Sequence, residues 1–317
     1  MQRAGRSAQV ELIVNPRSGG GRAVKHLGRV ESLLRAAGLS VVTNRTRSLD
    51  HAEQLAARAV ERGAVAVAYG GDGLAGRVAA AVSGGGGVMG LLPGGRGNDF
   101  ARATGIPTSA EAACAVIVQG TAVDVDLGMA GDRPFLGIAS VGLDSAVSEL
   151  ANRSRLPLGR LVYSYSALTV IARWQPASFT VVVDDHAGRS VRTFAGWSVA
   201  VANSGVYGGG LRMAPCASLQ DGLLDVVTAA RTSKTKLLAV LPRMFVGRHL
   251  SDPCFDTRRG TRVVVDGDRP LILFADGEPV GELPVELTVR RAALRLLAPP
   301  GSALLRRPDM PHDDPAV

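Results

Sequence analysis

Hydrophobic residues between positions 9 and 127 follow two alternating patterns. Short continuous apolar runs, each followed by a turn rich in Gly, Asn or Ser, predict buried strands. These runs are residues 10–14, 40–44, 64–69 and 88–92. Between the runs, apolar residues recur every three to four positions, as one buried helix face requires; an example is the set Val24, Leu27, Val30, Leu33 and Leu34. The alternation predicts βαβ units, a parallel sheet and a Rossmann-like α/β domain.

Polar residues three positions apart predict where two of the helices begin. Asp50 with Glu53, and Thr108 with Glu111, have the spacing of a capping box, in which side chains satisfy free backbone N–H groups in the first helical turn. We expect one helix to open at Asp50 and another at Thr108.

After Leu127 the pattern changes to strand-like runs separated by Gly, Pro, Asn and Asp. It predicts an antiparallel β domain with a helical insert near residues 158–174. The chain has 317 residues, of which 46% are hydrophobic, so two domains with separate cores are expected. We place an α/β domain at residues 1–127 and a β domain at residues 128–296, with residues 297–317 packing back on the first domain.

The charge of the chain limits its partners. Its 36 Lys and Arg against 28 Asp and Glu give a net charge of +8, which attracts nucleotides, nucleic acid or anionic membrane surfaces. An arginine-rich background composition explains the same charge. Nucleic-acid binding is the weakest of these interpretations, because the basic residues are scattered and no aromatic stacking platform is visible.

Neither a membrane-spanning segment nor a disulfide framework is expected. No apolar run approaches the roughly 18 residues that a spanning helix needs, and the N-terminus lacks the apolar core of a signal peptide. The three cysteines, Cys114, Cys216 and Cys254, are far apart and have no metal-binding spacing. These features predict a cytoplasmic protein, at most peripheral on the inner membrane surface.

Three glycine-rich turns directly follow predicted strands, at residues 15–23, 70–73 and 93–102. Because the carboxyl ends of parallel strands meet at one edge of a sheet, the three turns are expected to converge where ligands bind. Glycine lets the backbone approach a phosphate closely, and the helix N-termini that follow supply N–H groups. None of the turns matches the dinucleotide or Walker fingerprints, so a different phosphate site is predicted.

Seven motifs, in order and spacing, resemble the diacylglycerol kinase catalytic family. That family includes the sphingosine and ceramide kinases and is more distantly similar to NAD kinases and phosphofructokinases. The motifs are VNPRSGGGRA, GGDG, LPGGRGNDFARATGIP, DVDLG, ASVGLDSAV, VANSGVYGGGLRMAPCASLQDGLLDVV and FADGEPV. The resemblance extends over residues 10–299, nearly the whole chain.

The resemblance implies an N-terminal nucleotide-binding domain, a C-terminal antiparallel β-sandwich domain and a reaction cleft between them. It also implies ATP and Mg²⁺, the metal held by Asp72 through water, and a bracing role for Asp99. The residues implied at the nucleotide are Asn15, Ser18, Gly19, Gly20, Gly21, Gly70, Gly71, Asp72, Gly73, Gly97 and Asn98. Phosphoryl transfer requires positioning and charge neutralisation more than covalent chemistry from the protein, which such a site would supply.

In the second domain the resemblance makes Asp276 the general base for the acceptor hydroxyl, with Glu278 beside it. The residues by themselves also fit a plain hairpin turn at 276–278. A structural metal is implied at Asp221 and the backbone carbonyl of Leu223, within a segment that includes Asp225. Asp-Gly is also a favoured turn pair, so a simple turn remains an alternative.

The chain departs from the family pattern at three positions. Leu74 stands where the family has a phosphate-binding threonine, Arg77 stands at an acidic position, and Arg96 replaces a second threonine. Arginine can clamp a phosphate through two charge-assisted hydrogen bonds, so Arg96 is a further candidate nucleotide ligand. The same departures also fit an inactive homologue that binds without turnover.

The expected activity is transfer of the γ-phosphoryl group of ATP to a lipid hydroxyl, diacylglycerol-like by resemblance. A sphingoid, a polyprenol-like alcohol or a small hydroxylated metabolite are alternative acceptors. Apolar residues at 143–150 and 158–170 are expected to shelter acyl chains, although a helix core explains them equally. The expected partners are the nucleotide, this acceptor, an anionic membrane surface and a second copy of the chain in a homodimer.

Overall fold

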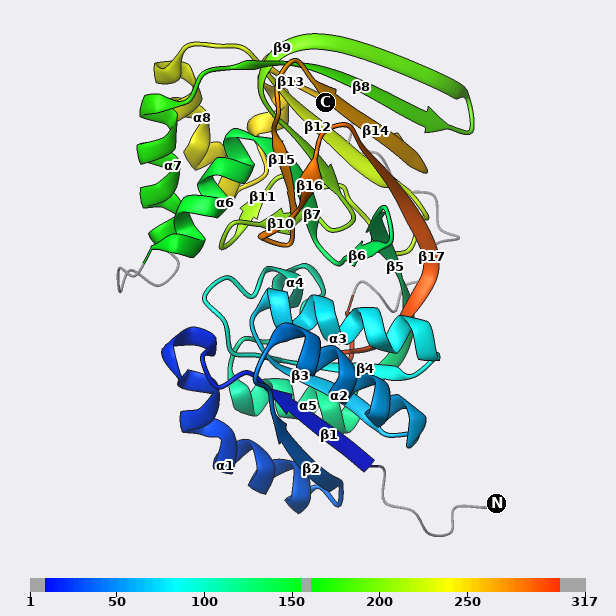
Figure 1. Cartoon of the computed structure of the whole chain (residues 1–317). Helices are drawn as coiled ribbons and strands as arrows, with labels where there is room; N and C mark the ends of the chain where they lie inside the picture. Colours follow the sequence, from blue (N-terminus) through cyan, green and yellow to red (C-terminus); the bar gives the residue numbers. More distant parts are fainter. Residues whose placement is uncertain (1–8, 155–160, 303–317) are drawn as a thin grey trace.

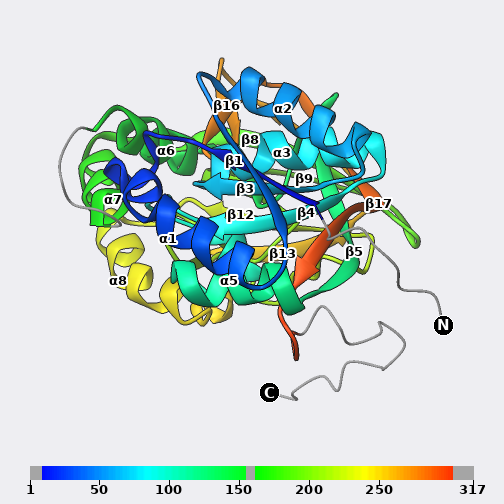
Figure 2. The same cartoon turned by 90° about the horizontal axis from the view of Figure 1, so that it is seen from below.

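The computed structural model describes residues 9–154 and 161–302. Its N-terminal part is a parallel sheet in the order β2-β1-β3-β4 (Figure 1). Helices α1 and α5 cover one face, and α2 and α3 cover the other (Figure 2). The strands are β1 (Gln9–Val14), β2 (Ser40–Arg45), β3 (Val65–Gly70) and β4 (Val88–Pro93). The helices are α1 (Arg22–Ala36), α2 (Leu49–Glu61), α3 (Asp72–Gly85), α4 (Asp99–Ala103) and α5 (Ala110–Gln119), with a 3₁₀ turn, η1 (Ser18–Gly20). The predicted α/β domain and its four strands are confirmed.

The predicted helix starts at Asp50 and Thr108 are wrong by one or two residues. Helix α2 is capped by Ser48, whose side chain accepts a hydrogen bond from the backbone of His51. Helix α5 is capped by Ser109, which accepts from the backbone of Ala112. Serine is as good an N-cap as aspartate and better than threonine, and in both cases it stands within two residues of the predicted position.

The C-terminal part is an antiparallel β-sandwich. Its main sheet runs in the order β16-β15-β7-β9-β8-β14-β17, and β12 pairs with β9 and β13. The strands of this region are β5 (Thr121–Ala130), β6 (Arg133–Phe135), β7 (Ile138–Gly142), β8 (Ala177–Asp185), β9 (Gly188–Ala202), β10 (Val206–Tyr207), β11 (Leu211–Arg212), β12 (Leu224–Ala230), β13 (Phe255–Gly260), β14 (Arg262–Gly267), β15 (Ile272–Ala275), β16 (Glu278–Glu282) and β17 (Val285–Ala298). The predicted antiparallel β domain is confirmed.

Three helices and a 3₁₀ turn accompany the sandwich: α6 (Leu143–Arg153), α7 (Leu161–Arg173), α8 (Lys234–Phe245) and η2 (His249–Ser251). Helix α7 is the predicted insert near residues 158–174, of which residues 158–160 lie outside the described part. Helix α8 was not predicted, because Pro242 interrupts its pattern, although its inner face packs into the same core cluster as Ile171 of α7. Among the described residues, no helix is long and apolar enough to cross a membrane.

Strands β5 and β17 connect the two parts. They pair with each other in antiparallel register, and β17 then pairs in parallel with β4 at Arg295 and Leu296. Residues 297 and 298 are therefore part of β17, and residues 303–317 lie outside the described part. Asp126 fills the irregularity in this ladder: its carboxylate accepts hydrogen bonds from Ala292 N and Gly222 N, both at 2.7 Å. The two parts are thus joined by continuous sheet, and the predicted division at residues 127 and 128 stays a prediction.

Candidate active site

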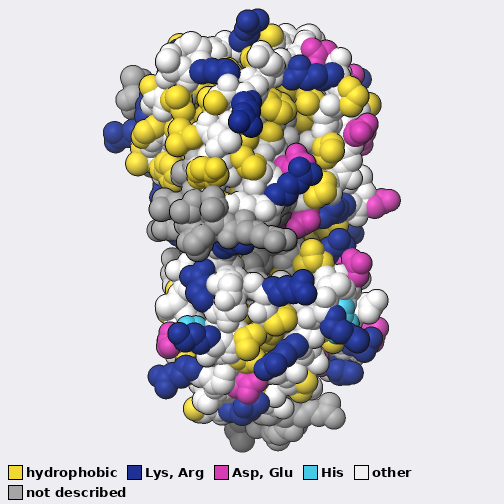
Figure 3. Space-filling model, turned by 60° about the vertical axis from the view of Figure 1, so that its left-hand side comes forward, with side chains coloured by type: hydrophobic (Ala, Val, Ile, Leu, Met, Phe, Trp, Pro, Cys, Tyr) yellow, Lys and Arg dark blue, Asp and Glu magenta, His cyan; other side chains and the backbone are white. Residues whose placement is uncertain are grey.

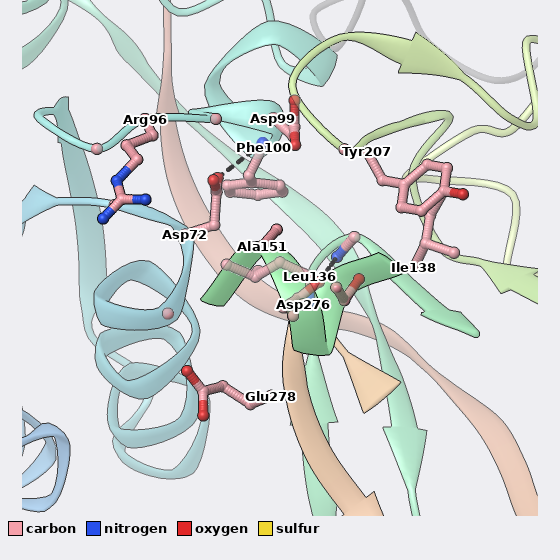
Figure 4. A pocket seen from close by; sticks show the side chains of 18 of the residues that line it. Asp72, Arg96, Asp99, Phe100, Leu136, Ile138, Ala151, Tyr207, Asp276 and Glu278 are labelled. Carbon is pink, nitrogen blue, oxygen red and sulfur yellow. Dashed lines mark hydrogen bonds between the residues drawn. The ribbon is translucent and has the colours of Figure 1, made fainter. Parts of the chain in front are cut away.

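A cavity of about 290 Å³ lies between the two parts of the molecule. From the N-terminal side, the turns after β1, β3 and β4 line it, as the sequence predicted for convergent glycine turns. From the C-terminal side it is lined by residues 136–138, Ser140, α6, the β10–β11 hairpin and the β15–β16 turn. Figure 4 shows Asp72 and Asp276 on facing sides of this cavity.

The turn after β1 is held by its own backbone and by the neighbouring turn. Gly19 has φ +59°, and a Cβ atom there would lie 2.3 Å from the carbonyl oxygen of Gly94, so only glycine fits. The hydroxyl of Ser18 accepts a hydrogen bond from Gly71 N at 3.3 Å. Arg17, Ser18 and Gly19 line the cavity. Gly20 and Gly21 do not line it, and the side chain of Asn15 instead accepts a hydrogen bond from Arg17 N.

Asn98 braces the turn after β4. It has φ +54°, and its side chain accepts a hydrogen bond from Gly95 N at 2.8 Å and donates to Gly95 O at 3.3 Å. Arg96 and Gly97 line the cavity from the same turn, and the Arg96 side chain is exposed at its edge (Figure 4). The resemblance implied that Asn98 contacts the nucleotide while Asp99 braces the loop. In the structure Asn98 holds the loop, and Asp99 is the one of the two that lines the cavity.

Asp72 and Asp99 form a close pair of carboxylates beside Gly97. A Cβ atom on Gly97 would lie 3.1 Å from Oδ2 of Asp72 and 3.0 Å from Oδ2 of Asp99. Asp72 accepts a hydrogen bond from Phe100 N, and Asp99 accepts one from Gly209 N of the C-terminal part, at 2.9 Å. Burial raises the pKa of Asp72, and burial together with the charge of Asp72 raises the pKa of Asp99 to about 7.

This carboxylate pair fits a divalent cation that is bound with the phosphates of a nucleotide. Oδ1 of Asp99 is buried and has no hydrogen-bond partner. A cation would favour the ionised form of both carboxyl groups, against the burial that raises both pKa values and the charge of Asp72 that adds to the shift of Asp99. Mg²⁺ typically takes one or two carboxylates, with waters and phosphate oxygens as its other ligands. Within residues 9–154 and 161–302, no group of three His, Cys, Asp or Glu side chains is placed to hold a metal by itself.

Asp276 enters the cavity from the β15–β16 turn. Its backbone is left-handed, with φ +50°, and its carboxylate accepts hydrogen bonds from Leu136 N at 2.7 Å and Gly137 N at 2.8 Å. Burial raises the pKa of Asp276 to about 6; the two amides oppose this shift, and the charge of Asp72 adds to it. The carboxyl group is therefore held in place by two backbone amides, with a pKa above the usual range for aspartate.

Two glycines of α3 lie beside the β15–β16 turn, at distances where an added Cβ atom would make ordinary contact with it. A Cβ atom on Gly73 would lie 3.7 Å from Oε1 of Glu278, and one on Gly76 would lie 3.8 Å from Oδ2 of Asp276. The candidate acid–base residues of one domain thus lie against the helix that opens at Asp72 in the other.

Known proteins similar to this chain include several named as diacylglycerol kinases or lipid kinases. Residues 9–130 match the family described as "Diacylglycerol kinase catalytic domain", and residues 137–298 match the "YegS C-terminal NAD kinase beta sandwich-like domain". A diacylglycerol kinase of Mycobacterium tuberculosis is 35% identical over 299 residues, which cover 92% of this chain and 95% of that protein. The chain belongs to the diacylglycerol kinase family. This agrees with the resemblance read from its motifs.

Other members of the diacylglycerol kinase family match over similar lengths. A Pseudomonas aeruginosa protein described as "Probable lipid kinase YegS-like" is 31% identical, covering 96% of this chain and 99% of its own length. The crystal structure of a diacylglycerol kinase from Bacillus anthracis superposes with a TM-score of 0.72 at 17% identity, covering 94% of this chain and 99% of that one. The structural likeness shows a shared fold.

Two departures from the family pattern lie away from the first cavity. Leu74 is 1% exposed and packs under Gly70 in the core, so its side chain does not reach the cavity in place of the family's phosphate-binding threonine. As the third residue of α3 it points toward the sheet. Arg77 forms ion pairs with Glu53 at 3.2 Å and Asp50 at 3.6 Å. Its guanidinium group is therefore held by these carboxylates and does not line the first cavity beside Asp72. Arg96 is the departure that lines the first cavity.

Arg77 lines a second cavity of about 330 Å³. Leu49, Glu53 and Ala80 contribute to it, as do residues 132–134. It shares Gly73, Asp276 and Glu278 with the first cavity, so the two spaces meet at the predicted acid–base residues. Sequence reasoning did not find this space, because its walls come from α2, α3 and the β5–β6 region together.

Arg259 lies at the predicted metal site of Asp221 and Leu223. The carboxylate of Asp221 accepts a hydrogen bond from Leu223 N at 3.0 Å and pairs with Arg259, which also pairs with Asp225 at 3.2 Å. The single positive charge of Arg259 is shared between the two carboxylates, and burial raises the pKa of Asp225 to about 6. The structure thus shows the Asp-Gly turn that was the alternative, and metal binding there stays an untested prediction.

Two further functional candidates escaped sequence reasoning. Arg22, the first residue of α1, donates to Gly19 O at 3.1 Å and to Gly95 O at 3.0 Å, so it joins the turns after β1 and β4. Tyr207 lines the cavity and hydrogen bonds to buried Asp144, whose pKa burial raises to about 6. A basic residue directly after a glycine turn, where the helix dipole disfavours it, was the available signal for Arg22.

Proposed function

We propose that this lipid kinase family member transfers the γ-phosphoryl group of ATP to a hydroxyl of a diacylglycerol-like lipid, with Mg²⁺. One observation carries the proposal: Asp276, held by two backbone amides, faces Asp72 and the glycine turns across one cavity. A positioned carboxylate opposite a phosphate-binding surface is what phosphoryl transfer to an alcohol needs.

The phosphates are assigned to the N-terminal side of the cavity. The glycine turns and the N-terminus of α3 line that side, a helix N-terminus favours phosphate, and Arg17 and Arg96 add positive charge at the rim. Asp72 and Asp99 would hold Mg²⁺, which when bound neutralises charge on the phosphates.

The nucleoside is assigned to the second cavity. Glu53 and Glu278 offer carboxylates that accept hydrogen bonds from ribose hydroxyls, and Leu49 and Ala80 offer apolar contacts for the base. Because the cavities meet at Gly73 and Glu278, a nucleotide bound there would extend its phosphates toward Asp72.

The chemical step assigns the proton to Asp276. As the acceptor oxygen bonds to the γ-phosphorus, its hydroxyl proton passes to the Asp276 carboxylate, and the bond from the γ-phosphorus to the β–γ bridging oxygen breaks to release ADP. A pKa of about 6 leaves this carboxylate mostly ionised at neutral pH and able to accept the proton.

The acceptor is assigned to the C-terminal wall. Leu136, Ile138, Ala151, Val206 and Tyr207 line that side, and Figure 4 shows several of these side chains around Asp276. An apolar wall beside a base favours an alcohol that carries a hydrophobic group, which supports a lipid over a small hydrophilic metabolite.

A transfer assay with γ-³²P-ATP tests the proposal. The acceptors are dioctanoylglycerol, sphingosine, a short polyprenol and glycerol, each with and without Mg²⁺. Labelling of dioctanoylglycerol above the others is expected, and Asp276→Asn serves as the inactive control. Preferential labelling of another acceptor would change the substrate. Tight ATP binding with no labelled product would favour an inactive homologue that binds without turnover. The structure gives less support to that alternative, because buried Leu74 does not obstruct the cavity.

A further inference from the structure

Five of the nine large hydrophobic side chains that are exposed in the described residues lie on α7, α8 and the residue after α8. They are Tyr165 (46% exposed), Leu168 (56%), Leu238 (37%), Phe245 (46%) and Val246 (61%). We call this set the α7–α8 apolar face. Figure 3 shows hydrophobic side chains gathered over this upper part of the molecule, with lysine and arginine side chains among them.

The two helices form one surface because their inner faces share a core. Ile171 of α7 and Leu237, Val240 and Met244 of α8 pack in the same buried cluster. Lys234 at the start of α8 donates a hydrogen bond to Ala172 O at 2.7 Å, near the end of α7. The inner faces of the two helices therefore form the core, and the exposed side chains of the α7–α8 apolar face contribute little to it.

The charged residues within the two segments that form the face are all basic. Residues 161–173 and 234–248 contain five basic residues and no Asp or Glu. Lys236 and Arg243 are paired with Asp252, while Arg173 and Arg248 are exposed. Apolar side chains within a basic rim complement a bilayer with anionic headgroups, because the rim attracts the phosphates while the apolar groups insert shallowly.

The face also lies beside the wall assigned to the acceptor. Helix α6 packs against α7, and Ser148 and Ala151 of α6 line the cavity. A bilayer at the α7–α8 apolar face would present its lipids next to that wall.

We propose that the α7–α8 apolar face docks on an anionic lipid bilayer and so supplies the acceptor from the membrane. The role of docking, which is to supply the acceptor lipid, rests on the proposed function. Docking itself is measured separately. Leu168 and Phe245 insert, and Arg173 and Arg248 contact the headgroups.

Vesicle flotation of the full chain, with phosphatidylcholine vesicles containing about 30% phosphatidylglycerol, tests the docking face. The double variant Leu168→Ser, Phe245→Ser is expected to bind about tenfold or more weakly, since it removes two exposed side chains whose apolar surface would leave water on docking. Its matched control is Val191→Ser, which removes a 61% exposed valine from β9 and is expected to bind like wild type.

Arg173→Gln with Arg248→Gln should weaken binding and reduce its salt dependence, whereas Arg29→Gln on α1 should not.

A second readout separates docking from chemistry. Phosphorylation of monodisperse dioctanoylglycerol, without vesicles, is expected to be unchanged in the Leu168→Ser, Phe245→Ser variant. Unchanged vesicle binding in that variant would overturn the docking proposal. So would sedimentation velocity that shows a wild-type dimer made monomeric by the two serines, because the face would then belong to a second copy. If wild type docks through this face yet phosphorylates no lipid, the docking stands and the proposed function fails.

Discussion

Oδ1 of Asp276 lies 2.8 Å from the backbone nitrogen of Gly137, between β6 and β7, and a Cβ atom on residue 137 would lie 2.7 Å from that oxygen. The position of the proposed base therefore depends on a residue without a side chain. Leu136 N holds the second oxygen, so the carboxylate is fixed by backbone alone.

Asp276→Asn is expected to abolish phosphoryl transfer while ATP binding survives. The amide cannot take the hydroxyl proton, and the phosphate turns belong to the other domain. General-base contributions are typically about 10² to 10⁴ in rate, so turnover above roughly a tenth of wild type would refute the assignment. Turnover by γ-³²P transfer and binding by calorimetry provide the two measurements.

Gly137→Ala is expected to lower kcat about tenfold to a hundredfold with little change in ATP affinity, because a displaced base loses its alignment with the acceptor. The matched control is Gly281→Ala in the adjoining β16, where an added Cβ meets nothing within 4 Å. Equal kcat in both alanine variants would show that the carboxylate position is not critical.

The pH dependence of kcat/KM follows from the titration of Asp276. Only the ionised carboxylate accepts a proton, and its pKa is raised to about 6. We expect kcat/KM to fall by about tenfold per pH unit below that pKa and to level off above pH of about 7. A steady-state profile from pH 5 to 8 with a water-soluble acceptor checks this, and a flat profile down to pH 5 would contradict it.

The sequence predicted much of the N-terminal domain because hydrophobic runs and glycine turns are local signals. β3 (Val65–Gly70) lies within one residue of its prediction, and the convergence of the glycine turns follows from parallel strand geometry. Side-chain directions were harder to predict. The family has a phosphate-binding threonine at the position of Leu74. The side chain of Leu74 instead packs in the core, because of its position on α3. The Asp144–Tyr207 contact joins residues 63 positions apart, and no local pattern encodes it.

Arg22→Ala is expected to weaken ATP binding about tenfold, because it removes two charge-assisted hydrogen bonds that join the turns after β1 and β4. Arg22→Lys should lie between, since an ammonium group lacks the planar fork that spans both carbonyls. Lys25→Ala, an exposed change one turn along α1, is the control. Calorimetric affinities in the order wild type, lysine, alanine support the bridging role, and equal affinities exclude it.

Arg96 distinguishes a rebuilt phosphate site from one that has lost its function. It stands where the family has a threonine, and its exposed side chain lines the cavity. If it contacts the distal phosphates, its charge-assisted hydrogen bonds contribute roughly 1.5 to 3 kcal/mol. Arg96→Ala should then weaken ATP binding at least about tenfold, while AMP, which lacks the distal phosphates, should lose far less.

Calorimetric titration of ATP and AMP into wild type, Arg96→Ala and Arg58→Ala separates these cases, because Arg58 is an exposed arginine on α2 outside both cavities. A loss confined to ATP in the Arg96 variant supports a phosphate contact. Losses of binding free energy below about 0.5 kcal/mol for both nucleotides are the ordinary size for a surface substitution. Such losses would show that Arg96 is a solvated charge. Arg17 and the backbone amides would then be the donors at that side of the cavity.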